Sequence, residues 1–252
     1  MRFLKILFYG FLVFVAIGFF FRPKAGGFLG FFNSEDVMVS EAMEEMEMDL
    51  EPDGFDEIFI SGNFKVTIAQ EENYEVNLDV KDDLKPYVSV EQNGGRLEVR
   101  MKSGLFKNKF ERGEIFIAAP NIRRVKASGG VELKTRNTIE TDQMELEVSG
   151  ASNVHLAVVA DRMETHLSGA GSMDLEGEAD IAEISISGAG KVNAYELVTN
   201  RLEVHVSGAG MARVHAQEEL DVRVSGAASL RYKGNPTISQ SISGAGSVRS
   251  AN

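Results

Sequence analysis

The chain has 252 residues, a formal net charge of −12 and no cysteine. Without cysteine it cannot form disulfides, cysteine-ligated metal sites, a thiol nucleophile or a lipid-modified N-terminal cysteine. The acidic balance argues against nucleic-acid binding, because that function needs a broad basic surface.

Aromatic residues are concentrated at the start of the chain. Ten of the sixteen Phe residues precede residue 33, none follows Phe116, and there is no Trp. From Ser128 onward the only aromatic residues are Tyr195 and Tyr232. A globular core normally relies on large side chains, so this long stretch predicts a thin interior filled by small ones. Elongated repeat folds have such interiors.

Residues 1–32 predict a membrane anchor with an interfacial segment. The uncharged run 6–21 is flanked by basic residues on both sides. With Phe3 and Leu4 included, a transmembrane helix of this length comes close to the roughly 30 Å hydrocarbon core of a bilayer. The alternative is a cleaved signal peptide, but cleavage near Ala16 or Gly18 would leave a very apolar new terminus. We therefore expect an uncleaved anchor.

Residues 33–54 predict an acidic linker. The run from Glu35 to Glu57 contains no Lys or Arg, which favours a solvated spacer that holds the next domain off the membrane. The rest of the chain, residues 55–252, is expected to form a single domain.

A short repeat decides the expected fold. A Ser-Gly pair, mostly continued as Ser-Gly-Ala-Gly, recurs every 18–21 residues. The members are Ser128 and Gly129, Ser149 and Gly150, Ser168 and Gly169, Ser187 and Gly188, Ser207 and Gly208, Ser225 and Gly226, and Ser243 and Gly244. About 19 residues are too few for a helical hairpin, but they suit one coil of a right-handed parallel β-solenoid.

The residues around each Ser-Gly corner alternate as strands do. Positions one, three and five before the serine are mostly apolar, as in Val206, Val204 and Leu202. Positions five and seven after it repeat the pattern, as in Val154 and Leu156. Such period-two columns predict the inward face of a strand.

The corner residues have a physical role in this interpretation. Glycine admits positive φ, and alanine adds little bulk where coils stack closely. We expect the stacked serine hydroxyls to satisfy polar groups inside the bend.

The same pattern begins earlier, at Ser61 and Gly62, and further strand-like segments follow. These are 74–80, 88–90, 97–101 and 115–118, with a turn at Asn93, Gly94 and Gly95.

Three features of the sequence carry a resemblance to a known family. They are the opening residues Phe55, Ile58, Ile60, Ser61 and Gly62, the later Ile117 and Pro120, and the serial Ser-Gly-Ala-Gly coils. Over residues 55–249 the chain resembles the bacterial putative autotransporter-adhesin head GIN domain family. The resemblance implies a parallel β-helix at the cell envelope. It brings no catalytic residues.

Three outward rows are candidate sites. An acidic stripe lies four residues before the serines: Glu145, Glu164, Glu183, Glu203 and Asp221. It could hold divalent cations weakly or a partner, or be neutralised by Arg162, Arg201 and Arg223. His166 and His205 lie two coils apart, nearly 10 Å, too far to share a metal.

The third row lies six residues after the serines and reads Lys134, His155, Asp174, Asn193, Arg213, Arg231 and Arg249. Its last three members could meet an anionic glycan or lipid, or form a solvated edge.

No catalytic constellation or cofactor site emerges from these patterns, so we expect no enzyme. The leading hypothesis is a non-catalytic, adhesin-like binding module, membrane-anchored, with the solenoid periplasmic or extracellular and a glycan or protein of the envelope as ligand. The alternative is a bactofilin-like scaffold that self-associates end to end through an exposed strand.

Overall fold

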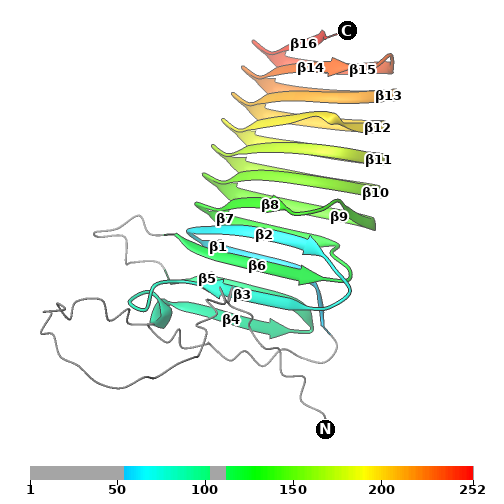
Figure 1. Ribbon diagram of the computed structural model, residues 1–252. Helices are drawn as coiled ribbons and strands as arrows, with labels where there is room; N and C mark the ends of the chain where they lie inside the picture. The colour runs from blue at the N-terminus through cyan, green and yellow to red at the C-terminus, as the bar shows by residue number, and fades with distance from the viewer. Residues whose placement is uncertain (1–53, 103–111, 252) are drawn as a thin grey trace, which may run out of the picture. The chain divides into compact units, whose positions relative to one another are not determined.

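The computed structural model describes residues 54–102 and 112–251, and these residues are almost entirely β-structure (Figure 1). The shorter strands of the first part are β1 (Phe55–Gly62), β2 (Phe64–Gln70), β3 (Glu75–Asp79), β4 (Val88–Asn93), β5 (Gly95–Met101), β6 (Gly113–Ala119), β7 (Arg124–Gly129) and β8 (Glu132–Thr135), with a 3-10 helix, η1 (Lys85–Tyr87). The coils that follow are β9 (Ile139–Gly150), β10 (Asn153–Gly169), β11 (Ser172–Gly188), β12 (Lys191–Gly208), β13 (Met211–Gly226), β14 (Ser229–Lys233), β15 (Thr237–Gly244) and β16 (Ser247–Ser250).

Successive coils stack as parallel strands in register, which confirms the predicted parallel β-solenoid. β10 pairs with β11 along its whole length, so that Ser168 lies opposite Ser187 and Gly169 opposite Gly188. The same serine-to-serine register holds from β11 to β12, from β12 to β13 and from β13 to β15. Neighbouring strands are therefore one repeat of 18–20 residues apart in sequence and about 4.8 Å apart in space.

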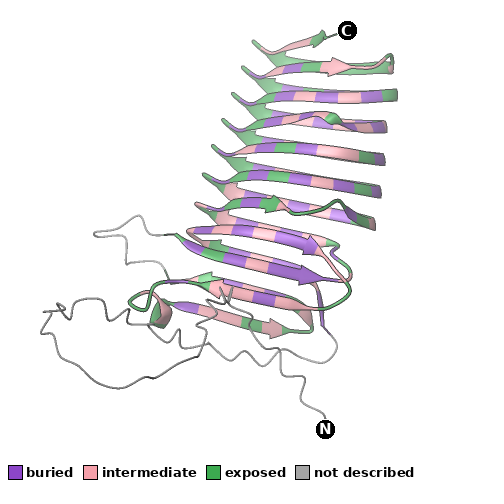
Figure 2. Cartoon of the chain, viewed as in Figure 1, coloured by how far each residue is buried: buried purple, intermediate pink, exposed green. Residues whose placement is uncertain are grey.

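The core is a thin interior lined by the predicted columns (Figure 2). In β10 the buried residues alternate from Val154 to Ala160, and again from Met163 to Leu167. Between these two runs Asp161 and Arg162 are both exposed, which interrupts the alternation. Each turn therefore consists of two strand segments joined by this exposed bend and by the Ser-Gly corner. Ala, Val, Leu and Ile supply most of the burial, as the lack of aromatic residues predicts.

The corners depend on glycine, as expected. Gly169, Gly188 and Gly208 have φ of 115°, 109° and 109°, a region that residues with a side chain rarely adopt. The following alanine donates its backbone N–H to the glycine carbonyl of the previous coil, at 2.9 Å from Ala189 to Gly169.

The hydroxyls of the corner serines are expected to satisfy polar groups inside the bend, but five of these serines point away from it. The exposed corner serines are Ser168, Ser187, Ser207, Ser225 and Ser243. They are exposed because the strand alternation that buries the preceding residue turns the serine outward. Backbone hydrogen bonds between successive corners satisfy the polar groups of the bend instead.

The two ends of the solenoid differ. At the N-terminal end β4 pairs antiparallel with β5, and β3 pairs antiparallel with β6. The sequence predicts these four strands, but not the antiparallel direction of β3 and β4. At the other end, Ile238 and Ile242 are 37% and 41% exposed, although their columns predict burial, because among the described residues no strand lies beyond β15 to cover them.

The predicted anchor (1–32) and acidic linker (33–54) lie outside the described residues, apart from Gly54. Within the described ranges, no helix has the length and apolar character needed to cross a membrane.

Thr165→Val is expected to stabilise the protein by roughly 1 kcal/mol. Thr165 is fully buried between Leu146 and Ile184, and its hydroxyl oxygen has no hydrogen-bond partner among the residues that the structure describes. Valine removes this unsatisfied group at nearly the same volume. Urea unfolding followed by circular dichroism measures the change.

Thr199→Val is the matched control. Thr199 is equally buried, but its hydroxyl donates a hydrogen bond of 2.8 Å to the carbonyl of His215. Its loss should cost about 1 kcal/mol. If both variants shift stability in the same direction, the assignment of the unsatisfied hydroxyl is wrong.

Candidate functional site

The corner serines form one continuous row along the solenoid, here called the serine row. It has eight members on eight neighbouring strands: Ser61, Ser128, Ser149, Ser168, Ser187, Ser207, Ser225 and Ser243. The parallel pairing of β1 with β7 joins Ser61 to Ser128, although 67 residues separate them in sequence. Because the side chains alternate, the serine row shares its outward face with two further rows, two and four residues before each serine.

An open groove of about 570 Å³ runs along the C-terminal half of the serine row. Its outward lining comes from Ser168, Ser187, Ser207, Ser225 and Ser243, together with His166, Ser185, His205, Arg223 and Ser241. The groove therefore combines hydroxyl, imidazole and guanidinium groups with the apolar Leu167, Ile186, Val206 and Val224.

The predicted acidic stripe lies on five neighbouring strands. Glu145, Glu164, Glu183, Glu203 and Asp221 pair in register from β9 to β13. Within the stretch that the structure describes, no group of three or more His, Asp or Glu residues is placed to hold a metal ion. Weak cation binding along the stripe stays a prediction.

Cations neutralise the stripe unevenly. Glu203 lies 3.0 Å from Arg223, whose guanidinium also lies 3.6 Å from Asp221. Arg201 instead contacts Asp180, at 3.6 Å, outside the stripe. Of the three arginines expected to neutralise the stripe, Arg223 is the one with an ion pair to it among the described residues.

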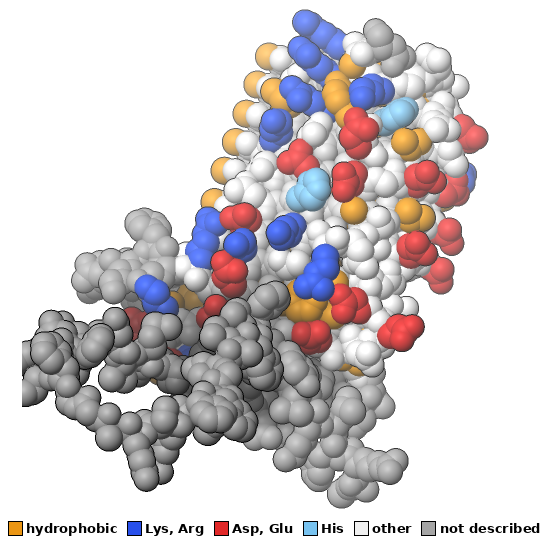
Figure 3. Space-filling model, in the orientation of Figure 1, with side chains coloured by type: hydrophobic (Ala, Val, Ile, Leu, Met, Phe, Trp, Pro, Cys, Tyr) orange, Lys and Arg blue, Asp and Glu red, His pale blue; other side chains and the backbone are white. Residues whose placement is uncertain are grey.

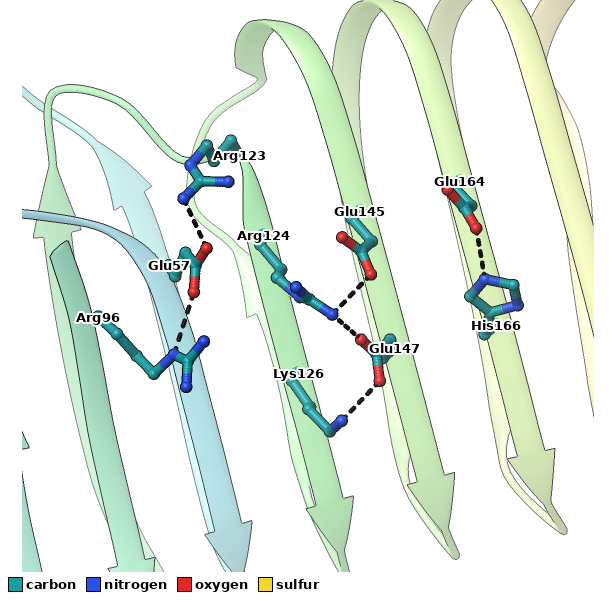
Figure 4. Close-up of polar contacts among 9 residues, drawn as sticks. All are labelled: Glu57, Arg96, Arg123, Arg124, Lys126, Glu145, Glu147, Glu164 and His166. Carbon is teal, nitrogen blue, oxygen red and sulfur yellow. Dashed lines mark hydrogen bonds and ion pairs between the residues drawn. The ribbon is translucent and has the colours of Figure 1, made fainter. Parts of the chain in front are cut away.

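His166 and His205 each contact the carboxylate two residues earlier in their own strand. The distances are 2.7 Å from His166 Nε2 to Glu164 and 2.8 Å from His205 Nε2 to Glu203. Figure 4 shows the first of these pairs. Both histidines therefore act as partners of the stripe.

A denser ion-pair network lies where the stripe meets the first part of the solenoid (Figure 4). Arg124 on β7 contacts Glu145 at 2.8 Å and also contacts Glu147, while Lys126 lies 2.7 Å from Glu147. Hydrogen bonds from Lys126 and Arg124 lower the pKa of Glu147 to about 2. Desolvation by burial is the main cause that raises the pKa of Glu145. The two carboxylates therefore have opposite pKa shifts.

Glu57 is the centre of a second cluster, which the sequence does not reveal. It is 8% exposed and lies 3.0 Å from Arg96 and 2.5 Å from Arg123. The guanidinium of Arg96 also lies 4.1 Å from the ring centre of Phe59. These residues come from β1, β5 and the segment before β7, and only the stacking of these elements brings them together.

Glu147→Gln is expected to weaken the acid sensitivity of the fold. In the unfolded chain a glutamate titrates near its ordinary pKa of 4.5, whereas folded Glu147 titrates at about 2. Its ionised form therefore adds stability that is present above pH 4.5 and is lost as the pH falls from 4.5 to 2. Melting temperatures measured across this window should fall less steeply in the variant than in the natural protein.

Glu178→Gln is the control for this comparison, because Glu178 is an exposed carboxylate on β11. It should leave the acid slope unchanged. An identical slope in the natural protein and Glu147→Gln would contradict the role of the network in acid stability.

The predicted row on the other segment of each turn is also in register. Each member of this row pairs with the next member on the neighbouring strand, from β8 to β16. The members are Lys134, His155, Asp174, Asn193, Arg213, Arg231 and Arg249. On the face seen in Figure 3, Lys and Arg side chains gather at the C-terminal end. The last three arginines therefore form a basic ladder.

Several solved structures are similar to this chain, including the following three. A putative adhesin from Bacteroides fragilis has a TM-score of 0.74 and 25% identity, with 78% of this chain and 92% of that chain covered. A putative adhesin from Parabacteroides distasonis has a TM-score of 0.64 and 25% identity, with the same coverages. A putative lipid binding protein from the same species has a TM-score of 0.65 and 21% identity, with 79% and 93% covered, and indicates the shared fold alone.

A search of curated proteins finds no match. The family described as putative auto-transporter adhesin, head GIN domain, matches residues 54–236, a span from the start of β1 to just past β14. This match confirms the resemblance that the corner repeat carries. The chain therefore belongs to the putative auto-transporter adhesin, head GIN domain, family.

Proposed function

We propose that this chain is a non-catalytic, adhesin-like binding module of the bacterial cell envelope. The observation that carries the proposal is the set of outward rows in register, which offers the same contacts at a fixed spacing along the solenoid. Such a surface suits an extended partner with a repeating structure. Membership of the adhesin-like family, and the adhesin names of two similar structures, support the same class of function.

Pull-down with the full chain tests this proposal. Cell-wall glycans and envelope proteins are presented separately, and we expect one of the two classes to be retained. Ser187→Tyr blocks the serine row, and Asn193→Tyr blocks the row on the other segment of the turn. At least one variant should lose the partner. Failure to retain any partner from either class would contradict the binding function.

The proposal includes an envelope location through the predicted anchor at residues 1–32. Protease treatment of intact cells and spheroplasts tests it, because a periplasmic or extracellular solenoid is cleaved in at least one of these preparations. Protection of residues 58–252 in both would indicate a cytoplasmic domain.

A self-assembling scaffold is the second candidate function. The exposed Ile238 and Ile242 on β15, next to a strand edge without a partner among the described residues, favour it, because such an edge is a template for pairing with another chain. The antiparallel strands β3 and β4 at the other end argue against simple parallel stacking of copies. Sedimentation distinguishes the functions: a monomer at high concentration would exclude the scaffold.

A further inference from the structure

The basic ladder is a line of three guanidinium groups on adjacent strands. Arg213 on β13 lies opposite Arg231 on β14, which lies opposite Arg249 on β16. Adjacent strands place their backbones about 4.8 Å apart. Arg231 and Arg249 are exposed, and Arg213 is half-buried. The ladder therefore presents one positive charge per strand along the axis of the solenoid.

Among the described residues, no carboxylate pairs with the charges of the ladder. Elsewhere on the solenoid, Arg123, Arg124 and Arg223 all contact carboxylates. No ion pair involves Arg213, Arg231 or Arg249 within residues 54–102 and 112–251. Like charges at this spacing repel one another. A chain with a net charge of −12 has many acids with which to pair them, so the unpaired ladder is a local feature that a ligand can neutralise.

A β-bulge shapes the surface beside the ladder. Ala194 pairs with Val214 and Val198 with His215, so Tyr195, Glu196 and Leu197 are extra residues in β12 at this point. The Tyr195 ring lies 4.7 Å from the Lys233 ammonium and 6.0 Å from the Arg213 guanidinium. These distances suit cation–π contacts, which restrain the two cations. Bulges often redirect side chains in this way next to functional sites.

We propose that Arg213, Arg231 and Arg249 bind a linear anionic polysaccharide that runs along the solenoid axis. The inference rests on the proposed binding function and names its surface and ligand class. A guanidinium can donate two parallel hydrogen bonds to a carboxylate, sulfate or phosphate group. Ser229 and Ser247 lie opposite one another on the same two outer strands and supply hydroxyl groups beside the ladder for neutral sugar contacts.

The surroundings of the ladder favour a narrow polymer over an anionic membrane. Asp174 lies two strands before Arg213 in the same row, and the exposed Glu196 lies 3.4 Å from Lys233. An anionic bilayer laid over this face would approach these carboxylates as well as the arginines. A single polysaccharide chain can follow the line of arginines without covering the acids.

A binding assay with the full chain, purified in a nonionic detergent, tests the proposal. The immobilised ligands are dextran sulfate and polygalacturonate, and neutral dextran is the blank. The natural protein should bind both polyanions and not dextran, more weakly as salt rises. The triple variant R213Q/R231Q/R249Q should bind on the order of tenfold or more weakly, as the loss of charge-assisted hydrogen bonds predicts. Replacing the same three residues with lysine should restore part of the affinity.

The matched control is R100Q/R162Q/R201Q, which removes three exposed positive charges that lie neither in the ladder nor in the groove along the serine row. It should bind nearly as well as the natural protein. An equal loss in both triple variants would mean that net charge alone drives binding, and would overturn the proposal. The proposal would also be overturned if the natural protein bound neither polyanion, or if it bound only vesicles that contain phosphatidylglycerol. Circular dichroism confirms that each variant is folded.

The envelope pull-down separates two kinds of failure. If R213Q/R231Q/R249Q retains the natural envelope partner as well as the unchanged protein does, the ladder is not the site and the binding function stands. If the natural protein retains neither polyanion nor envelope partner, both proposals fail.

Discussion

Gly188→Val should lower the melting temperature by about 5 °C or more, because it places a β-branched side chain where the backbone has φ of 109°. Such a conformation costs roughly 1–3 kcal/mol for a residue other than glycine. The new Cβ would also lie 2.6 Å from the carbonyl oxygen of Gly169 in the previous coil. Because a solenoid is stabilised by contacts between neighbouring repeats, one distorted coil weakens the interfaces on both sides. Thermal unfolding followed by circular dichroism measures the loss.

Glu183→Gln, five residues earlier in the same strand, is the control for the corner. Glu183 lies between Glu164 and Glu203 in the acidic stripe, and the hydroxyl of Ser185 contacts it at 3.4 Å. Removing its charge relieves repulsion between neighbouring carboxylates. We expect no change or a small rise in melting temperature. Equal losses in the two variants would contradict the assignment of inward, outward and corner positions.

Phe64→Ala is expected to destabilise the protein by about 3–5 kcal/mol. Phe64 on β2 is fully buried and is one of the few aromatic residues in the core. The packing around it is tight: a Cβ on Gly113, the paired residue of β6, would lie 2.9 Å from its ring. The truncation leaves a cavity that small neighbours cannot fill. Urea unfolding should show the loss as a shift of the midpoint.

Phe116→Ala, on the neighbouring strand β6, is the control for this truncation. Phe116 points outward, is half-buried and lies under the Arg136 guanidinium, at 4.1 Å from its ring centre. It should cost much less than Phe64→Ala. A similar cost for both would mean that the inward face of the first part of the solenoid is assigned wrongly.

The sequence reveals the regular coils because three signals agree there. The spacing of the Ser-Gly pairs predicts the coil length, the apolar columns predict the inward face, and the glycines predict the positive φ at each corner. All three follow from local rules of alternation and backbone geometry. Ser168 is where local patterns mislead. Its column points outward, and the expectation that its hydroxyl satisfies polar groups inside the bend overlooked the alternation that the buried Leu167 establishes.

The irregular start of the solenoid and its ion pairs are not visible in the sequence. Nothing local indicates that β3 and β4 pair antiparallel, since alternation is the same for both directions. The cluster of Glu57 with Arg96 and Arg123 joins residues 39 and 66 positions apart. The network of Arg124, Lys126 and Glu147 likewise depends on which strand lies next to β9. These contacts follow from the stacking order.

Distances along the serine row test the central claim, the in-register stacking of the coils, most directly. The chain has no cysteine, so pairs of serines can be replaced by cysteine and spin-labelled without interference. Ser128 and Ser225 lie five strands apart in the row, which predicts a backbone separation of about 24 Å. Ser128 and Ser243 should be about 5 Å farther apart. Pulsed electron paramagnetic resonance measures these distances. Distances that grow by one strand spacing per coil would support the in-register stacking, and distances unrelated to the number of coils would contradict it.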